Sequence, residues 1–395
     1  MANVSSSNGL EKRPKLRFPG FDEPWKEIKI GDIFKVTRGN VLSSALVSSE
    51  KSNGYTYPVF SSQTKDDGLM GYYNEFLFED AITWTTDGAN AGTVHFRKGK
   101  FYCTNVCGVL LNSYGYANRC IAEILGRVSK RYVSYVGNPK LMNNVMSEIC
   151  IYIPSLAEQS HIDDFLLVLD KKIEKQRQLV DSLKKYKRGV IQHIFRRSHG
   201  QTESQQWQQV RLGDIFKKVS RRNTDGKIKN VITNSAEYGL IPQRDFFDKD
   251  IAIEGNTENY YVIENGDFVY NPRKSITAPY GPFNRYTLKD QGIISPLYTC
   301  LVLKVNINPS YLAWYFKSDA WHRYIYDNGS QGVRHDRVSM TDDLLMGIPV
   351  IFPDRTTQDS IANALDLVEN RLHLAQNKMD LLNMTRKGFM QQLFI

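Results

Sequence analysis

The chain contains an internal repeat, and no other feature of the sequence constrains its fold as strongly. The segment Trp25–Lys35 reads WKEIKIGDIFK, and the segment Trp207–Lys217 reads WQQVRLGDIFK. A second match closes each half, where KRGVIQHIF at 187–195 corresponds to RKGFMQQLF at 386–394. The sequences between these matches differ. We infer a duplicated framework that carries two different inserts.

Both halves end in a segment with the spacing of a long amphipathic helix. Apolar residues recur from Ile162, and again from Ile361, in alternating steps of four and three. No proline or glycine interrupts either segment before Gly189 and Gly388. A stripe of this kind, sustained over about four heptads, is typical of a coiled-coil seam. The seam residues assigned are Ile162, Leu166, Leu169, Ile173, Val180 and Leu183 in the first helix, and Ile361, Leu365, Val368, Leu372, Met379 and Leu382 in the second.

We expect the two helices to pack against each other as an antiparallel coiled coil, because each stripe alone would be exposed to water. An antiparallel pair would place the inserts at opposite ends and relate them by a pseudo-twofold axis. A parallel pair, which the sequence leaves open, would place them side by side. In an antiparallel register centred near 178 and 377, the charged seam residues gain partners: Lys187 would lie close to Glu369, and Arg386 close to Asp170.

The inserts have a mixed α/β (α+β) pattern. Short runs rich in β-forming residues are bounded by Gly, Asn and Asp, and helical spacing covers Arg119–Gly126 and Ser310–Tyr326. The β-type runs are Tyr57–Phe60, Ala81–Trp84, Cys107–Leu111, Asp267–Tyr270 and Leu301–Val305. The expected organisation is an N-terminal arm (1–24), a first domain (25–157), a first helix (158–195), a linker (196–206), a second domain (207–356) and a second helix (357–395).

Composition and motifs exclude several classes of protein. The first residues lack the apolar core of a signal peptide and no 18-residue apolar run follows, so we expect a cytoplasmic protein without a membrane partner. The five cysteines show neither a disulfide framework nor zinc-ligand spacing, so no metal is expected. The sequence has no phosphate-binding loop, nucleophile elbow, zinc-protease helix or methyltransferase Asn/Asp-Pro-Pro-aromatic motif. We therefore expect no catalysis, since a hydrolase would need a carboxylate or histidine cluster.

The signals for nucleic-acid binding are stronger. A net charge of +9 suits a polyanionic partner, and amide and guanidinium side chains can bond base edges while lysines contact phosphates. Such loops are also common as solvated surfaces, and the turn at Asp87-Gly88 suits a conformational role. The candidate DNA-binding residues of the first insert are Arg38, Asn40, Ser62, Gln63, Thr64, Lys65, Thr85, Thr86, Asn90, Lys98 and Lys140. Those of the second insert are Arg221, Arg222, Asn223, Asn271, Arg273, Lys274, Arg285, Gln331, Arg334, His335 and Arg337.

The whole pattern resembles the DNA-specificity (S) subunits of type I restriction–modification systems. The resemblance rests on Arg17-Phe-Pro-Gly-Phe before Trp25, on the repeated Gly-Asp-Ile-Phe, on Ile-Pro pairs at 153–154 and 348–349, and on the two helix endings. It covers the chain from about Arg17. The strings at 87–92 and 292–298 are also similar to those of the family's target-recognition domains.

The resemblance implies two target-recognition domains that each read one half of a bipartite, asymmetric site in double-stranded DNA. It implies that the helices set the spacing and dock two methyltransferase subunits, which methylate adenine with S-adenosylmethionine. Two restriction subunits, which use ATP and Mg²⁺, would add cleavage of unmethylated DNA. No cofactor would bind this chain. The alternative is a stand-alone DNA-binding or scaffold protein on the same frame, which would bind DNA without a methyltransferase.

Overall fold

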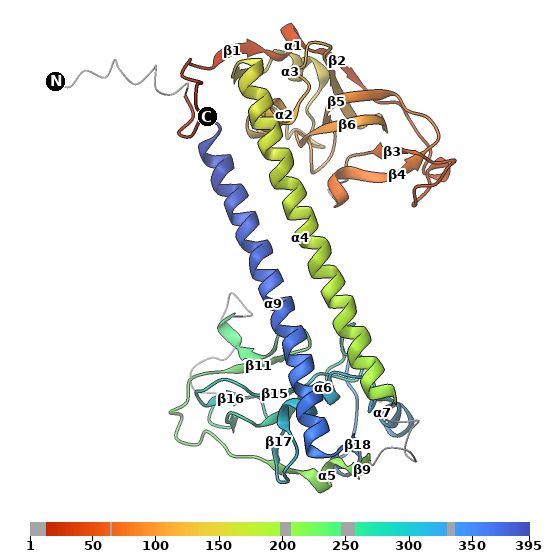
Figure 1. Ribbon diagram of the computed structural model, residues 1–395, viewed down its shortest axis with the longest axis vertical. Coiled ribbons are helices and arrows are strands. Elements are labelled where there is room, and N and C mark those ends of the chain that lie inside the picture. Colours follow the sequence, from red (N-terminus) through yellow and green to blue (C-terminus); the bar gives the residue numbers. More distant parts are fainter. Residues whose placement is uncertain (1–12, 64, 198–206, 246–256, 330–335) are drawn as a thin grey trace, which may run out of the picture. The chain divides into compact units, whose positions relative to one another are not determined.

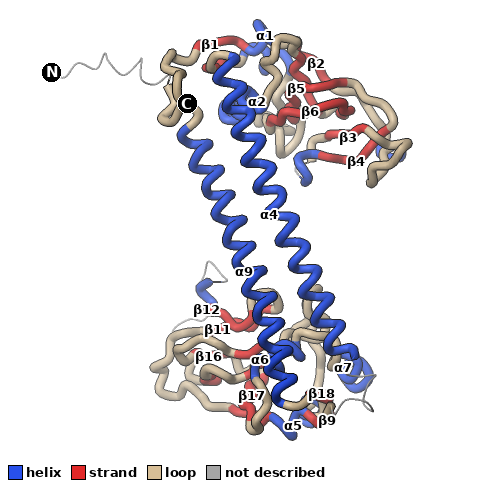
Figure 2. The backbone as a smooth tube through the Cα atoms, viewed as in Figure 1, coloured by secondary structure: helices blue, strands red, loops and turns tan. Residues whose placement is uncertain are grey.

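The computed structural model describes residues 13–63, 65–197, 207–245, 257–329 and 336–395 (Figure 1). It forms two compact units: unit 1 contains residues 1–177 and 378–395, and unit 2 contains residues 178–377. Helices α4 (Leu156–Arg197) and α9 (Arg355–Gln392) each contribute to both units and are uninterrupted in Figure 2. None of the helices described is long and apolar enough to cross a membrane.

Unit 1 is built on a six-stranded sheet of order β2-β7-β5-β6-β3-β4. A separate two-stranded sheet pairs β1 with β8, and α2 contacts the large sheet at β6. The strands are β1 (Lys26–Lys29), β2 (Lys35–Arg38), β3 (Tyr57–Phe60), β4 (Leu69–Tyr73), β5 (Phe78–Thr85), β6 (Val94–Cys103), β7 (Cys107–Leu111) and β8 (Cys150–Ile153). The helices are α1 (Ile30–Ile33), α2 (Arg119–Val128) and α3 (Asn143–Glu148), with short 3-10 turns η1 (Ser44–Leu46), η2 (Lys65–Gly68) and η3 (Ser129–Tyr132).

Unit 2 is built on a four-stranded sheet of order β10-β17-β14-β15. Three two-stranded sheets pair β9 with β18, β11 with β12, and β13 with β16. The strands are β9 (Gln208–Arg211), β10 (Phe216–Val219), β11 (Ile232–Ser235), β12 (Gly239–Pro242), β13 (Tyr261–Ile263), β14 (Phe268–Tyr270), β15 (Phe283–Arg285), β16 (Gly292–Ile294), β17 (Thr299–Leu303) and β18 (Pro349–Phe352). The helical elements are α5 (Leu212–Ile215), η4 (Gln243–Asp245), α6 (Pro309–Phe316), α7 (His322–Asn328) and α8 (Asp342–Met346).

The sheets of the two units share one frame. The strand order β2-β7-β5-β6 of unit 1 corresponds to β10-β17-β14-β15 of unit 2. The registers also agree: Ile82 lies opposite Leu110 in unit 1, and Phe268 lies opposite Leu301 at the same place in unit 2. The duplication inferred from the sequence therefore extends to the strands of the divergent inserts. Unit 1 adds β3 and β4 at one edge of this frame.

The helix pair is antiparallel within each unit, as expected. In unit 1, Phe165 packs edge-to-face on Phe389, and Arg386 Nε lies 2.8 Å from an oxygen of Asp170. In unit 2, Lys187 Nζ lies 2.6 Å from a carboxylate oxygen of Glu369. Residues later in α4 therefore contact residues earlier in α9. Both ion pairs predicted from the antiparallel register are present, because each charged seam residue faces a carboxylate of the other helix.

The assigned seam residues are all buried or half-buried. The fully buried ones include Ile162, Leu166 and Val180 on α4 and Leu365 on α9. The half-buried ones are Ile173, Leu183, Ile361, Val368, Leu372, Met379 and Leu382. Burial of this stripe removes apolar surface of both helices from water, which favours the pair by about 25 cal/mol per Å².

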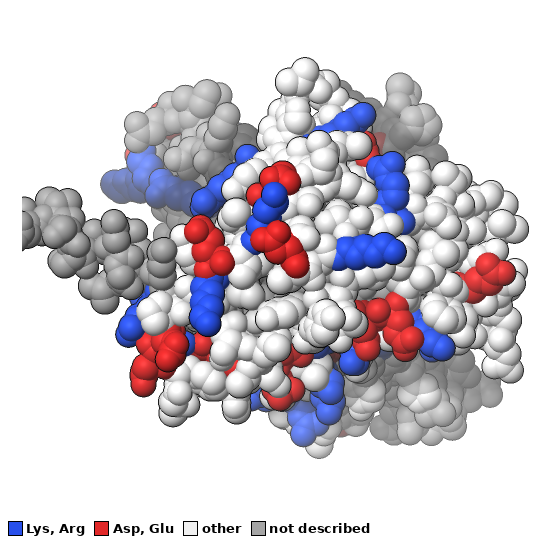
Figure 3. All heavy atoms as spheres, turned by 90° about the horizontal axis from the view of Figure 1, so that it is seen from above, with Lys and Arg blue, Asp and Glu red and all other residues white. Residues whose placement is uncertain are grey.

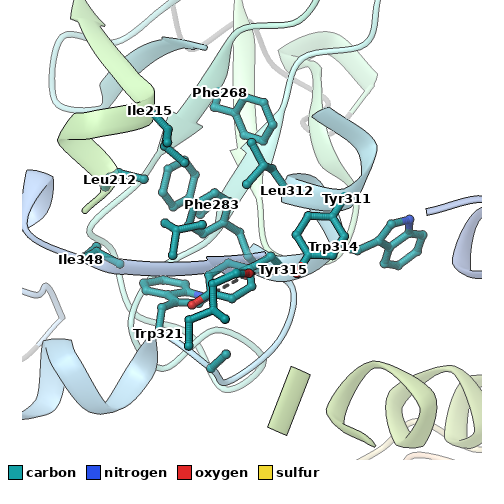
Figure 4. Packing of buried hydrophobic residues seen from close by; sticks show 14 of the residues in the cluster. Leu212, Ile215, Phe268, Phe283, Tyr311, Leu312, Trp314, Tyr315, Trp321 and Ile348 are labelled. Atoms are coloured by element: carbon teal, nitrogen blue, oxygen red, sulfur yellow. Dashed lines mark hydrogen bonds between the residues drawn. The ribbon is translucent and has the colours of Figure 1, made fainter. Parts of the chain in front are cut away.

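The core of unit 2 is aromatic. Figure 4 shows side chains from α5, β14, β15 and α6 pointing toward one another. Phe283 stacks on Phe316 with 3.9 Å between ring centroids, and Trp321 lies edge-on to both rings. Aromatic pairs in these geometries add about 0.5–1.5 kcal/mol beyond their buried area. This core gives the strands of unit 2 a rigid support.

Each long helix is fixed at its start by a buried glutamine. Gln159 Nε2 donates to the carbonyl of Pro154, and its Oε1 accepts from Asn118, which caps α2. Gln358 makes the equivalent bonds in unit 2: it donates to Pro353 and accepts from the backbone N–H of Asn308, which caps α6. Since a buried amide without partners is costly, these bonds hold the start of each long helix against its domain. We call these two sets of hydrogen bonds the glutamine locks.

The glutamine locks correct one assignment made from the sequence. The pairing of Ile153-Pro154 with Ile348-Pro349 is wrong, because the counterpart of Pro154 is Pro353. Strand register explains the shift: Ile153 lies opposite Lys26 at the end of β8, and Phe352 lies opposite Gln208 at the end of β18. Ile348 instead precedes β18.

The bounds of three expected helices also differ from the structure. The run Ser310–Tyr326 forms two helices, because the Ser318 hydroxyl bonds the carbonyl of Tyr315 and the N–H of Ala320 and ends α6. Helix α4 extends two residues beyond each expected end, to 156 and 197. Helix α9 begins two residues early, at 355, and ends at Gln392, since the following Leu393 and Phe394 turn into the core of unit 1.

The described part of the N-terminal arm is anchored. Arg17 makes two hydrogen bonds to the carboxylate of Glu158, at 2.9 and 2.6 Å. The N–H of Leu16 donates to the carbonyl of Gln392 at 2.9 Å, and Phe18 packs on the core of unit 1. A bidentate pair of this kind is geometrically specific. The arm therefore joins the start of α4 to the end of α9 within unit 1.

Candidate nucleic-acid interface

Two predicted binding segments of unit 2, distant in sequence, lie side by side. Arg273, just after β14, and Arg337 form an antiparallel β-bridge. The N–H of Val338 donates to Pro272 at 2.9 Å, and the N–H of Lys274 donates to Asp336 at 2.8 Å. We call residues 271–274 and 336–338 the unit 2 crossing. The main chain places Arg273, Lys274 and Arg337 together at one end of the sheet.

Unit 1 has the same arrangement. Asp87, just after β5, forms an antiparallel β-bridge with Lys140, and the N–H of Leu141 donates to Thr86 at 2.8 Å. We call residues 85–88 and 139–141 the unit 1 crossing. Strand register makes Thr86 the counterpart of Pro272, because Ile82 corresponds to Phe268. Lys140 of unit 1 therefore occupies the place of Arg337 in unit 2.

The two crossings differ in charge. In unit 2, the guanidinium groups of Arg273 and Arg337 share one carboxylate, that of Asp336, at 4.0 and 3.7 Å. In unit 1, Lys140 Nζ lies 3.9 Å from the carboxylate of Asp87, so the pair is balanced. Unit 2 thus presents a local excess of positive charge, and such an excess attracts phosphate groups.

On the face drawn in Figure 3, Lys and Arg are interspersed with Asp and Glu. Positive charge does not dominate this face. Among the described residues, no group of three or more His, Cys, Asp or Glu is placed to hold a metal ion.

Asn271 lies at the unit 2 crossing, but its amide bonds the protein itself. Its side-chain oxygen accepts from the N–H of Arg273 at 2.9 Å, and its nitrogen donates to the carbonyl of Asn234. Asn234 in turn bonds Val269 and Asn284. This buried amide network fixes the hairpin between β14 and β15. Asn271 therefore shapes the crossing through its own hydrogen bonds, and its contact with DNA stays a prediction.

In unit 1, a buried arginine supports the described part of a candidate loop, residues 61–63 and 65–68, which we call the 61–68 loop. Arg97 Nη2 donates to the carbonyl of Asp67 at 2.7 Å, and Nε donates to the Thr83 hydroxyl. Its guanidinium lies 3.7 Å from the centroid of the Phe60 ring. Burial lowers the pKa of Arg97 to about 10, which leaves it charged at neutral pH. The loop needs this support because Asp66 and Asp67 have φ of 50° and 54°, which is unfavourable for residues with a side chain.

The other candidates of unit 1 fall into two groups: those in or beside the 61–68 loop and the unit 1 crossing, and those elsewhere in the unit. Asn90 Nδ2 donates to the carbonyl of Ser62, so it braces the same loop, and Thr85 and Thr86 are buried beside the crossing. Gln63 bonds the carbonyl of Leu69, and Lys65 is exposed. Arg38, Asn40 and Lys98 are not at the crossing: Asn40 bridges to Thr104, and Lys98 lies 3.5 Å from Asp80 near the start of β5. Thr64 lies outside the described residues.

The other candidates of unit 2 that the structure describes do not belong to the crossing. Arg221 is paired with Asp267 at 2.5 Å and with Glu264, and Arg222 bonds Asn259. Asn223 is buried and bonds the main chain of Ile228. Arg285 packs toward α6, where it donates to Ser310. Gln331, Arg334 and His335 lie outside the described residues.

Sequence reasoning missed two exposed apolar side chains beside the crossings. Ile276 follows Lys274 and is fully exposed, and Val136, in the turn that leads to Lys140, is 91% exposed. Both lie in turns closed by reciprocal main-chain bonds, 275–278 and 134–140. The sequence pattern that marks both positions is an apolar residue within a turn rich in Gly and Pro. This pattern was not among the features used to select binding residues.

A second apolar stripe on α9 was also missed. Leu367, Leu374 and Leu381 recur at seven-residue spacing and are each about two-thirds exposed. They do not belong to the seam, whose residues are buried or half-buried. Exposed leucines at this spacing are typical of a helix that packs against a further helix.

Comparison with known proteins identifies relatives of the chain. Residues 22–185 match the family model described as the type I restriction modification DNA specificity domain. A type I specificity subunit of Mycoplasma pneumoniae is 33% identical over 156 residues, which is 38% of this chain and 50% of that protein. The N-terminal sequence of another subunit from the same organism is 37% identical over 144 residues, covering 36% of this chain and 75% of that sequence.

A solved structure extends the likeness to the whole fold. The crystal structure of a type I restriction–modification S subunit from M. genitalium aligns with a TM-score of 0.63 over 97% of this chain and 99% of its own. Its sequence identity is 18%, so this likeness concerns the fold alone. The chain spans about half the length of the first of the curated relatives above.

Proposed function

The chain belongs to the DNA specificity subunits of type I restriction–modification systems, and we propose that each of its two units binds one half of a bipartite, asymmetric DNA site. The observation that carries the proposal is the pair of equivalent crossings. Both units hold the same two main-chain segments together, yet they present Asp87 and Lys140 in one case and Arg273 and Arg337 in the other. One frame with different side chains suits two different half-sites.

The long helices support a role in spacing. A split site needs two binding units held at a fixed separation, and α4 and α9 are continuous through the boundary between the units. A paired helix is stiffer than a flexible linker. We propose that their length sets the number of unread base pairs between the half-sites.

We propose that the repeated framework docks two methyltransferase subunits. The features that both units share, Gly-Asp-Ile-Phe and the glutamine locks, would present similar surfaces to two identical partners. The exposed leucines of α9 add apolar surface for partner helices. In this proposal, adenine methylation with S-adenosylmethionine belongs to those partners. DNA cleavage with ATP and Mg²⁺ would belong to restriction subunits, and the complex would act in the cytoplasm.

Methylome sequencing of host DNA tests the proposal. The host is compared with the gene intact, deleted and restored, and expression of a partner methyltransferase is verified in each case. We expect one bipartite adenine-methylated motif that is present only with the gene. An unchanged methylome with the partner present would favour a stand-alone DNA-binding or scaffold protein, which would bind DNA in a gel-shift assay without any methyltransferase.

The spacing role has its own test. Inserting one heptad into each helix, in register, lengthens each by about 10 Å, which is about three base pairs of B-DNA. We expect the gap in the methylated motif to widen by about that number while the bases on either side stay the same. The same gap in the lengthened protein would contradict the spacing role.

A further inference from the structure

Ile276 is held at the tip of a rigid turn. The turn spans Ser275 to Ala278 in the connection between β14 and β15, and its two ends exchange main-chain bonds of 3.0 and 3.2 Å. The Ser275 hydroxyl also accepts from the N–H of Ala278 at 3.1 Å. Ile276 is fully exposed at this tip. The main-chain bonds of the turn therefore hold an apolar side chain in a solvent-exposed position.

The surroundings of Ile276 are cationic. Arg273 and Lys274 precede it in the chain, with Ser275 between, and the bridge at the unit 2 crossing adds Arg337. Single exposed apolar residues are ordinary on protein surfaces. This one differs because it is preorganised and flanked by groups that attract phosphate. The charge commits the site to one occupant, namely DNA.

The shape of the hairpin selects the groove. The major groove of B-DNA, about 12 Å wide, admits a two-stranded β-ribbon, whereas the minor groove is about 6 Å wide. The apolar group on the floor of the major groove is the 5-methyl of thymine. Resting on the function proposed above, we propose that Ile276 is a specificity residue that contacts a thymine methyl in the half-site bound by unit 2.

The equivalent hairpin of unit 1 makes the proposal specific to unit 2. Its connection between β5 and β6 exposes Ala89, whose side chain is a single methyl group, between Gly88 and Asn90, so it offers no counterpart of the long aliphatic side chain of Ile276. Ile276 should therefore affect only the half-site of unit 2. The thymines of the other half-site provide an internal control.

The test uses the full chain with its methyltransferase partner and duplexes that carry the methylated motif. Each thymine of both half-sites is replaced in turn by deoxyuridine, which lacks only the methyl group. Binding is measured for the unaltered protein, for Ile276→Ala, and for Val305→Ala, which shortens an exposed aliphatic side chain of unit 2 away from the crossing. Because Ile276 touches no core, its truncation should leave the fold intact.

We expect deoxyuridine at one position of the unit 2 half-site to weaken binding by about three- to tenfold. Ile276→Ala should weaken binding to the thymine duplex by a similar factor and abolish the difference between thymine and deoxyuridine, while Val305→Ala should behave as the unaltered protein. The inference is overturned if Ile276→Ala keeps the full difference, if the unaltered complex shows none, or if the half-site contains no thymine. Failure of the unaltered complex to prefer its motif over scrambled DNA would instead overturn the proposed function.

Discussion

The two crossings have the same main-chain arrangement and carry a different residue at every equivalent position. Both are β-bridges between the end of one strand and a distant segment, stabilised by one equivalent hydrogen bond, to Thr86 in unit 1 and to Pro272 in unit 2. Lys140 stands opposite a carboxylate, whereas Arg337 stands opposite a second arginine. Main-chain bonds do not depend on side-chain identity, so the frame can persist while the binding chemistry changes.

The units also stabilise their loops by different means. Unit 1 uses a buried guanidinium, that of Arg97, beneath its 61–68 loop, and unit 2 uses the amide network of Asn234 and Asn271. Both are buried polar groups with satisfied hydrogen bonds, which rigidify a structure and are costly to disrupt. Each unit thus carries its own internal support, and we expect the units to specify their half-sites independently.

The largest effect should come from exchanging one whole insert. Replacing residues 216–348 with residues 34–149 exchanges segments whose ends occupy equivalent places, because Ile30 bonds Ile149 as Leu212 bonds Ile348. We expect a methylated motif in which both halves have the sequence of the first half-site. Each mismatched base pair costs about 1–3 kcal/mol, so recognition of the old half-site should vanish. Methylation of the original motif by the assembled chimera would contradict the hypothesis that each unit specifies its half-site independently.

A smaller effect should follow from single substitutions at the crossings. Arg337→Ala and Lys140→Ala should each weaken binding by about 1–3 kcal/mol, the range of a good side-chain contact to a base. The loss of affinity should be confined to one half-site. On duplexes whose unit 2 half-site is altered, Arg337→Ala and the unaltered protein should bind with the same affinity. Competition binding measures this, with the paired Arg323→Ala on α7 as a control. Equal sensitivity to both half-sites in either variant would argue against two separate interfaces.

The sequence predicted the frame better than the site, for physical reasons. The repeat, the antiparallel register and the partners of Lys187 and Arg386 follow from periodicity along the chain. The crossings depend on contacts between segments far apart in sequence, such as Asp87 with Lys140, and no local pattern encodes them. Asn271 illustrates the limit, because a polar loop residue looks the same whether its amide faces DNA or a buried neighbour.

The glutamine locks should contribute equally in the two units. Gln159→Leu and Gln358→Leu each remove a buried amide, leave a proline carbonyl without its hydrogen bond and remove the acceptor of one asparagine N–H group. Asn118 keeps its second bond, to the carbonyl of Gly115. We expect each to lower the free energy of unfolding by about 1–3 kcal/mol. Urea unfolding measures the loss, with the exposed Gln391→Leu as the control. A large loss in one unit alone would show that the repeated bonds are not energetically equivalent.

The smallest effect should be a dependence on pH that arises in unit 1. Burial, and then the nearby charge of Arg97, lowers the pKa of His95 from its ordinary value of 6.5 to about 4. Between these values the unfolded chain binds a proton that the folded protein does not, so stability falls as the pH falls below about 6.5. At about pH 5.5 the loss from His95 should be about 1 kcal/mol. Comparing His95→Asn with the unaltered protein by urea unfolding at about pH 7 and pH 5.5 measures it, and His193→Asn on the exposed face of α4 is the control. If His95→Asn leaves the pH dependence unchanged, His95 is not the group that senses acid in unit 1, and His322 of unit 2, whose pKa is also lowered by burial, becomes the better explanation.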